Sequence, residues 1–273
     1  MFSSNSLRKK KKKKKETQIN ETWQQVKKKK KNTTNDIGGG WFLAPPKPMS
    51  LLCWNCRGLG NQCTENQLAD MVWAKDSSVV FLAKTWMDEA RLIQIQDRLQ
   101  FKNKFIAPRR NKTGGLVIFC KKDFDLNIET FSHNHIDTII NKGKAEEWRF
   151  TGFYGEPDTQ NRHEAWVCLK TLKSRGLAPW ICAGDFNEVT RQSEKLGRRI
   201  WPHAQMQAFR DVLDDCGFLD LGFLGSNFTW HKHFAHYTVW ERLDRVVATT
   251  DWLEISPDTK VYHLDVTSSD HKP

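Results

Sequence analysis

The sequence has 273 residues and a formal net charge of +11. Residues 1–50 hold 14 basic and 3 acidic side chains, whereas residues 51–273 hold 29 of each. The excess positive charge therefore belongs to the first 50 residues. The remainder is formally neutral, which excludes a domain that attracts acidic partners through net charge alone, and it has the length of one α/β domain with a full core.

The first 50 residues are dominated by lysine runs at Lys9–Lys15 and Lys27–Lys31. Such runs repel themselves and offer little apolar surface, so we predict a disordered tail. Gly38–Gly40 and Pro45–Pro48 then form a linker to a domain spanning residues 51–273. The lysines suit phosphate backbones or a nuclear-import signal, and solvated sequence without a selected role is the alternative.

The seven cysteines are too scattered for a disulfide framework, and no apolar signal segment follows the N-terminus. We expect a reducing compartment, either nuclear or cytoplasmic. No run of about 18 apolar residues predicts a membrane span, and no obligate protein partner is evident. Cys53 and Cys56 form a C-x-x-C pair, but residues three apart on a strand face opposite sides, so we do not expect metal there.

The first predicted elements of the domain follow a β, α, β order. Leu51–Asn55 and Val79–Ala83 are short apolar runs that predict strands. Between them, Leu68, Met71 and Val72 recur at helical spacing. This order is typical of a sheet with crossover helices.

Further along, Asp88–Gln100 predicts a helix with acidic residues in its first turn. Leu116–Cys120 and Trp148–Tyr154 predict strands, and the sequence between them alternates too loosely to place others. Thr159–Ser174 predicts a helix that leads into a strand beginning at Trp180.

The last third predicts one more helix and several short strands. Pro202–Cys216 carries an apolar face and ends before Gly217. The short strands are expected at Phe228–Trp230, Arg242–Ala248 and Lys260–Leu264. Helices between early, middle and late strands indicate an α/β domain with more than one run of sheet.

The segment PWICAGDFNEV places Asp185 and Asn187 at the end of a predicted strand. Residues two apart on an extended segment point the same way, so a carboxylate and an amide converge. Asp185 can orient or deprotonate a water while Asn187 donates a hydrogen bond to an anionic substrate, which favours hydrolysis of a phosphate ester. An ordinary Asp/Asn turn is the alternative.

Polar residues stand at the ends of other predicted strands too: Asn55, Tyr154, Asp185 with Asn187, Asn227, and Asp270 with His271. In order and spacing they resemble the endonuclease/exonuclease/phosphatase superfamily. The segments WNCRGLGN, GDFNEV, SNFTW, ERLDR and SDHKP are most similar to the endonuclease domain of plant LINE-type (non-LTR) retrotransposons. The resemblance extends from about Leu51 to Pro273 and implies a four-layer sandwich, in which two packed mixed β-sheets are flanked by helices and the active site lies at one end.

The resemblance also implies roles for these residues. Asp185 would position or activate the attacking water, and Asn187 would bind the scissile phosphate. His271, as an imidazolium, would stabilise charge on the phosphoryl oxygens, and Asp244 would hold that ring. Asn227 and Tyr154 would also contact the phosphate.

Asn55 and Asp270 would help to place a divalent metal, Mg²⁺ or alternatively Mn²⁺. Two features depart from the family. Lys84 stands where the family has a metal-binding Glu, and the family's further strand after SDHxP does not follow Pro273. We therefore expect impaired metal binding, a domain lacking its last strand, and His271 on a fraying terminus.

Several of these residues have other interpretations. Asp244 is also placed to pair with a neighbouring Arg, and Tyr154 to be a core tyrosine with a satisfied hydroxyl. Asn227 begins an N-glycosylation sequon, which requires a secretory signal. For His231, His233 and His236, which lack a carboxylate or Cys at ligand spacing, we favour a solvated loop over a metal site.

Three functions are compatible with the sequence. The first is a Mg²⁺-dependent endonuclease that nicks DNA, possessing the ancestral activity of a retrotransposon domain. The second is a catalytically inactive remnant that binds nucleic acid through its lysine tail. The third is a protein of the same fold that hydrolyses a lipid or inositol phosphate. The segment GDFNEV favours the superfamily members that act on nucleic acids over this third function.

Overall fold

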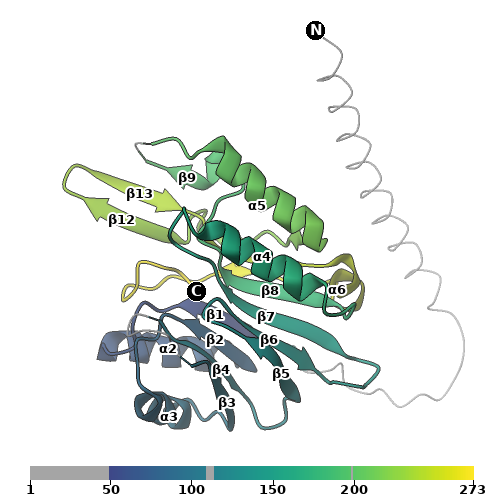
Figure 1. Cartoon of the computed structure of the whole chain (residues 1–273). Helices are drawn as coiled ribbons and strands as arrows, with labels where there is room; N and C mark the ends of the chain where they lie inside the picture. Colours follow the sequence, from purple (N-terminus) through teal and green to yellow (C-terminus); the bar gives the residue numbers. More distant parts are fainter. Residues whose placement is uncertain (1–48, 109–113, 198) are drawn as a thin grey trace, which may run out of the picture. The chain divides into compact units, whose positions relative to one another are not determined.

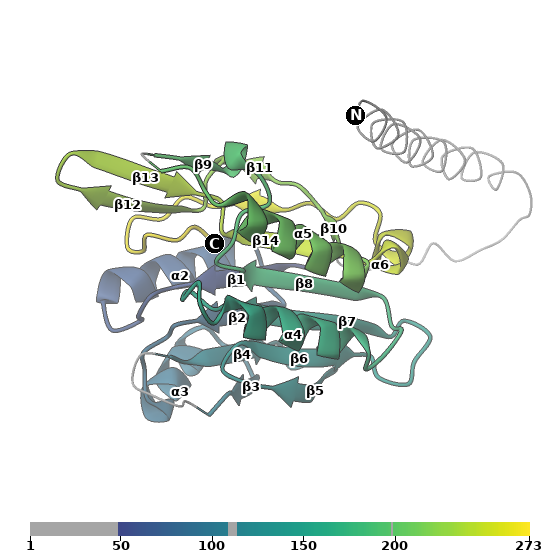
Figure 2. The same ribbon diagram turned by 45° about the horizontal axis from the view of Figure 1, so that its top comes forward.

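Two β-sheets pack face to face at the centre of the domain, and helices cover their outer faces (Figures 1 and 2). The computed structural model describes residues 49–108, 114–197 and 199–273. The predicted tail therefore lies outside the described residues, apart from Met49 and Ser50. No helix in the described ranges is both long enough and apolar enough to cross a membrane.

The smaller sheet has the strand order β1-β2-β4-β3. Its strands are β1 (Leu51–Asn55), β2 (Val79–Ala83), β3 (Asn103–Ile106) and β4 (Leu116–Cys120). Strand β1 runs parallel to β2, and the other pairs are antiparallel.

The larger sheet has the order β10-β14-β8-β7-β6-β5. Its strands are β5 (Leu126–Phe131), β6 (His135–Ile140), β7 (Trp148–Tyr154), β8 (Trp180–Asp185), β10 (Leu219–Asp220) and β14 (Asp244–Ala248). Strand β8 is parallel to β7 and antiparallel to β14, so this sheet is mixed.

The helices and small strands complete the outer layers. The helices are α2 (Gln62–Ala74), α3 (Glu89–Arg98), α4 (Arg162–Lys173), α5 (His203–Cys216), α6 (Thr250–Ile255) and the 3₁₀ turn η1 (Gln192–Glu194). The small strands are β9 (Lys195–Leu196), β11 (Leu224–Gly225), β12 (Trp230–Phe234), β13 (Tyr237–Glu241) and β15 (Tyr262–His263). Strands β12 and β13 form a hairpin that projects from the body of the domain (Figure 2).

The layers follow from side-chain alternation along buried strands. In β2, Val80 and Leu82 pack beneath α2 and α3, whereas Phe81 packs between the sheets. The predicted four-layer sandwich is therefore confirmed. Cys53 and Cys56 likewise belong to different cores, as expected for strand residues three apart.

Several strands were not predicted, among them β3, β5 and β6. Strand β5 is half-exposed, so it lacks an apolar run. Strand β6 carries the buried Asp137, whose carboxylate is neutralised by Arg149 at 2.8 Å, and this charge masks the apolar pattern. An ion-pair partner that lies on another strand leaves no trace in the hydrophobic pattern of the strand itself.

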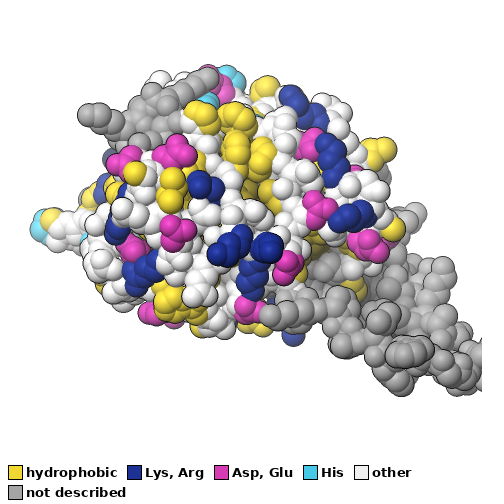
Figure 3. All heavy atoms as spheres, turned by 90° about the horizontal axis from the view of Figure 1, so that it is seen from below, with side chains coloured by type: hydrophobic (Ala, Val, Ile, Leu, Met, Phe, Trp, Pro, Cys, Tyr) yellow, Lys and Arg dark blue, Asp and Glu magenta, His cyan; other side chains and the backbone are white. Residues whose placement is uncertain are grey.

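Other boundaries also differ from the prediction. The strand expected at Phe228–Trp230 begins only at Trp230, so His231 and His233 lie on β12 rather than in a loop. The strand expected at Lys260–Leu264 shrinks to two residues. On the face of the domain in Figure 3, basic and acidic side chains are interspersed, in keeping with its neutral composition.

Strand β1 is an edge strand of the smaller sheet, and it packs opposite β8. A cavity of about 540 Å³ opens beside it, lined by β1, by residues 244–246 of β14, by residues 260–264 and by Pro273. The outer edge of β1 therefore faces a space wide enough for an extended segment.

This edge leads to a prediction about stability. Fusing about eight residues of alternating apolar and polar character after Pro273, which lines the cavity, should raise the melting temperature by about 2–4 °C for each kcal/mol gained. The gain is expected because the segment can pair with β1 and bury apolar surface. Thermal unfolding of the fusion is compared with that of a version carrying two prolines, which cannot complete the ladder. An unchanged melting temperature, with hydrogen exchange showing the segment paired, contradicts the prediction.

Candidate active site

Three neighbouring strands of the larger sheet bring polar side chains to one end of the sandwich. Asp185, at the end of β8, is paired in register with Asp244 on β14 and with Tyr154 on β7. Residues paired in register project from the same face of a sheet. Asn55 ends β1 of the other sheet, so the two sheets meet at this cluster.

His271 lies at the centre of the cluster. Its Nδ1 is 3.0 Å from Asp244 Oδ2, and its Nε2 is 3.7 Å from Asp185 Oδ2. The Asn55 amide donates to Asp185 Oδ2 at 2.8 Å and lies 3.2 Å from His271 Nε2. The fold thus brings three predicted site residues into direct contact: Asp185, predicted to activate water, His271, and Asn55, predicted to bind metal.

The backbone of His271 is firmly held, contrary to the expectation of a fraying terminus. His271 forms a β-bridge with Trp230, and its carbonyl accepts a hydrogen bond from the Trp54 indole at 3.0 Å. The next residue, Lys272, donates to the Thr229 carbonyl at 2.7 Å. The residue as a whole is only 4% exposed. These contacts come from segments distant in the sequence, which is why the expectation was wrong.

The charges of the cluster stabilise one another. Burial alone would lower the pKa of His271, but the carboxylates of Asp244 and Asp185 outweigh it, so the pKa is raised and the imidazolium is favoured. Burial raises the pKa of Asp185, and the opposing attraction of His271 only limits that rise. A carboxylate with a raised pKa is a stronger base toward water.

Asn187 is fixed beside Asp185 by a left-handed turn. Its φ is 53°, a conformation that Asn tolerates better than most residues. Its backbone N–H donates to Asp185 Oδ1 at 2.8 Å, and its amide donates to the Gly155 carbonyl at 2.8 Å. A Cβ on Gly155 would lie 2.2 Å from the Phe186 carbonyl, so only glycine allows this close approach.

Tyr154 and Lys84 face each other in the site. Burial and the nearby Asp185 raise the pKa of Tyr154, so its hydroxyl stays protonated as a donor. No described group meets hydrogen-bond geometry to that hydroxyl, and the Asn187 side chain lies close enough to oppose part of the rise in its pKa. The Lys84 ammonium lies 4.8 Å from the Tyr154 ring centroid, and burial lowers the pKa of Lys84. Lys84 therefore does lie within the site.

Asn55 and Asp270 each have one side-chain oxygen atom that is available to coordinate a metal ion. Asp270 Oδ2 pairs with Arg57 and accepts from the Trp230 indole at 2.9 Å. Asp270 Oδ1 and Asn55 Oδ1 are buried without partners in the described part of the chain. Unpaired buried oxygens of this kind suit a hard divalent cation. The carboxylates of Asp185 and Asp244 and the ring of His271 also lie within 4.8 Å of one another and could hold an ion.

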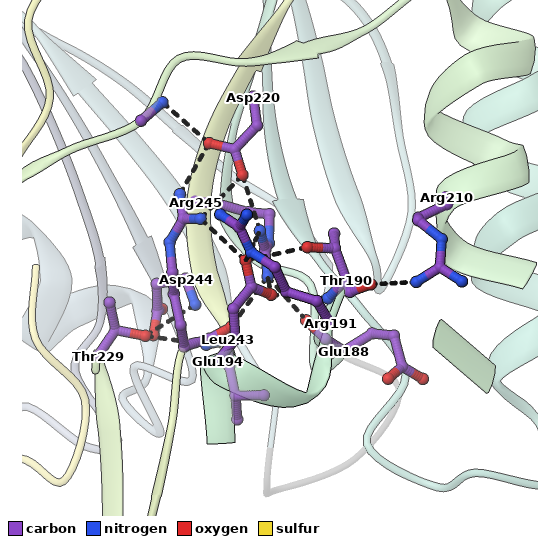
Figure 4. Close-up of polar contacts among 12 residues, drawn as sticks. Glu188, Thr190, Arg191, Glu194, Arg210, Asp220, Thr229, Leu243, Asp244 and Arg245 are labelled. Atoms are coloured by element: carbon purple, nitrogen blue, oxygen red, sulfur yellow. Dashed lines mark hydrogen bonds and ion pairs between the residues drawn. The ribbon is translucent and has the colours of Figure 1, made fainter. Parts of the chain in front are cut away.

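The structure does not bring Asn227 into the cluster. Its side chain is exposed, and no hydrogen bond joins it to another described residue. Thr229, two residues later, was missed by the sequence reasoning although it belongs to the same SNFTW segment. Its hydroxyl accepts from the backbone N–H groups of Leu243 and Asp244 at 3.0 and 2.9 Å, which fixes the start of β14 (Figure 4).

A second buried charge network holds β14 against the loop after β8. Arg245, whose side chain is fully buried, pairs with Glu194 at 2.7 Å and with Asp220 at 2.8 Å (Figure 4). Its guanidinium also donates to the Glu188 carbonyl at 3.4 Å. Because Asp244 precedes Arg245, this network supports the position of the carboxylate that holds His271.

Replacing Arg245 by Ala should therefore destabilise the domain by about 3–5 kcal/mol, since it leaves buried carboxylates without their partner. Arg191 contacts the same Glu194 at 3.5 Å but is 70% exposed, so Arg191→Ala is a matched control. The control should cost less than about 0.5 kcal/mol. Urea unfolding measures both, and equal losses would contradict a special role for Arg245.

Replacing Asp244 by Asn should lower the pKa of His271, because the anion that raises it most is removed while burial remains. An NMR titration of the imidazole protons in metal-free protein measures this shift. Asp215→Asn, which removes a surface carboxylate paired with Lys170, is the control and should leave His271 unchanged. A His271 pKa that does not move in Asp244→Asn would show that the contact carries no electrostatic coupling.

Two mixed sheets packed face to face, with a carboxylate, imidazole and amide cluster where their strands end, define a sandwich class that includes nucleases and phosphatases. The chain belongs to the endonuclease/exonuclease/phosphatase family, whose model matches residues 52–271. Members of this family generally depend on a divalent metal. No curated protein matches the sequence.

Solved structures share the fold at low identity. The endonuclease domain of TRAS1, a telomere-specific non-LTR retrotransposon, is 18% identical, with a TM-score of 0.64 over 82% of this chain and 95% of that one. The 3'-5' exonuclease NExo from Neisseria meningitidis is 14% identical, with a TM-score of 0.61 over 82% and 97%. An AP endonuclease from Archaeoglobus fulgidus is 11% identical, with a TM-score of 0.59 over 82% and 97%. At these identities the likeness establishes the fold alone.

Proposed function

We propose that residues 51–273 form a phosphodiester hydrolase domain that acts on DNA and descends from a LINE-type retrotransposon endonuclease. The observation that carries this proposal is the contact of His271 with both Asp244 and Asp185 beside Asn55. A buried base, a cation and amide donors in one place suit attack by water on a phosphate. The likeness in fold to the TRAS1 endonuclease domain supports the choice of DNA.

In this mechanism Asp185 orients the water and takes its proton, for which its raised pKa suits it. The His271 imidazolium stabilises the negative charge that develops on the phosphoryl oxygens, and Asp244 keeps that ring charged and aligned. The hydroxyl of Tyr154 would donate a hydrogen bond to the phosphate. The Asn187 amide would do so through the N–H that does not bond the Gly155 carbonyl. Asn227, which is exposed, would reach only the part of the substrate outside the cluster.

Asn55 and Asp270 would hold the divalent ion, Mg²⁺ or Mn²⁺, through their unpaired Oδ1 atoms. When bound, such an ion neutralises charge on the phosphate and polarises the P–O bonds. Lys84 opposes this, because it supplies a cation where the family supplies a carboxylate ligand. We therefore propose that metal binding and nicking are impaired in this chain.

An inactive remnant that binds nucleic acid through its lysine tail is the second candidate function, and the position of Lys84 inside the site favours it. A lipid or inositol phosphatase is less well supported, since no observation in the described residues points to such a substrate.

Changing Lys84 to Glu separates these functions. The variant should bind Mn²⁺ about 10- to 100-fold more tightly, the range by which single groups supporting a metal site alter affinity. It should also gain Mg²⁺-dependent nicking of supercoiled plasmid. Manganese binding is measured by electron paramagnetic resonance, so the test does not rely on activity.

The controls assign the cause of any gain. Lys84→Gln removes the positive charge without supplying a ligand, and Lys121→Glu makes the same charge change at a surface lysine that pairs with Asp76. Adding Asp185→Ala or His271→Ala to Lys84→Glu should abolish nicking. Robust nicking by the unmodified chain, with no gain in Lys84→Glu, would show that Lys84 does not occupy the metal position. Tighter metal binding without any nicking would favour the inactive remnant.

A further inference from the structure

Two histidines outside the catalytic cluster lie on the hairpin that projects from the domain (Figure 2). His231 and His233 are two residues apart on β12, so their side chains leave the same face of the strand. In the loop expected from the sequence the two rings would have had no fixed relation. The strand instead places them side by side.

The two imidazole rings are spaced as a shared metal ion would require. Their centroids are 5.1 Å apart, and their planes are inclined by 73°. With Zn–N bonds of about 2.0–2.1 Å and tetrahedral angles, two imidazoles on one ion have centroids about 5 Å apart. His231 and His233 can therefore offer one nitrogen each to the same ion while β12 keeps its conformation.

Both rings are held in place by residues of the neighbouring strand β13. The His231 ring stacks on Trp240, with centroids 4.7 Å apart, and His233 Nδ1 is hydrogen-bonded to Thr238 Oγ1 at 2.8 Å. This bond leaves Nε2 of His233 for a ligand, and metal-binding histidines commonly orient themselves through their second nitrogen in this way. Among the described residues, none is hydrogen-bonded to a ring nitrogen of His231.

The lysines near this pair are directed elsewhere. Lys232, between the two histidines, faces the other side of β12, where its ammonium lies 5.1 Å from the Phe234 ring centroid. Lys272 pairs with Asp265. Within the described residues, no carboxylate or thiol joins the two histidines in a group of three ligands. An ion bound here would thus keep water in its remaining positions.

We propose that His231 and His233 form a metal site separate from the catalytic cluster, which binds Zn²⁺ or a similar imidazole-preferring ion. Imidazole nitrogen suits zinc, copper and nickel, whereas Mg²⁺ prefers oxygen ligands. The pair therefore selects a different class of ion from the oxygen atoms of Asn55 and Asp270. This inference does not depend on the proposed function, although the His231 N–H donates to the Asp270 carbonyl at 3.2 Å and so joins the hairpin to the catalytic end.

The test measures Zn²⁺ binding to the full chain by isothermal titration calorimetry in excess Mg²⁺. The Mg²⁺ competes for the oxygen ligands of the cluster but not for imidazoles. NMR spectra of the imidazole nitrogens then identify the histidines that respond to Zn²⁺, and we expect His231 and His233 to shift. Zinc should also raise the melting temperature, because it binds the folded hairpin and not the separated side chains.

His231→Gln and His233→Gln should each weaken Zn²⁺ binding by about 100-fold or more, since the second of two linked ligands acts through its effective concentration. Thr238→Val should weaken binding about 10-fold, because the His233 ring loses the hydrogen bond that orients it. His203→Gln removes an exposed histidine at the start of α5 and is the matched control. It should bind Zn²⁺ like the unmodified chain.

Two results would overturn the inference. The first is a Zn²⁺ affinity that stays unchanged in both His231→Gln and His233→Gln, with melting temperatures in EDTA showing that both variants are folded. The second is a loss of binding in Cys63→Ser or Asp244→Asn while the two hairpin variants bind normally. That result would assign the ion to an exposed thiol or to the catalytic cluster.

Discussion

The contact of the buried His271 ring with two carboxylates is the interaction on which the end of the sandwich depends. Asp185 and Asp244 lie opposite each other on adjacent strands, and two buried anions there would repel without a cation between them. His271 supplies that cation, and the Trp54 indole of the other sheet holds its carbonyl. The two sheets are therefore joined where their polar ends meet.

A second group of buried, oppositely charged side chains lies next to the cluster, around Arg245 on β14. Arg245 and Arg242 are buried against Glu194 and Asp220, and each carboxylate accepts from both arginines. Buried ion pairs contribute little net stability compared with apolar packing, but they are costly to break and are satisfied in few geometries. Their effect here is geometric, because they position the start of β14 and hence Asp244. The β-sheet places the Asp244 carboxylate to within a strand register, and the ion network restrains it further.

The segment after β2 brings a lysine into the polar cluster at the end of the sandwich. Lys84 enters the cluster above the Tyr154 ring, and Trp86 emerges beside it. A lysine at this position adds a partly buried positive charge close to the carboxylate of Asp185.

Much of the fold was predictable because strands such as β2 and β8 are continuous apolar runs, and the residues after them are polar and constrained to one edge. Asn55, Tyr154, Asp185 and Asn187 could be placed at strand ends for that reason, whereas Asp244 was assigned to the site only from the family resemblance. Strands β5 and β6 were not predictable, since Asp137 is compensated by Arg149 from another strand. The sequence by itself determined which side chains end the strands. Only the tertiary structure decided that His271 is buried rather than frayed, that Asn227 faces solvent and that Trp86 adjoins the site, because each depends on contacts between segments far apart in the chain.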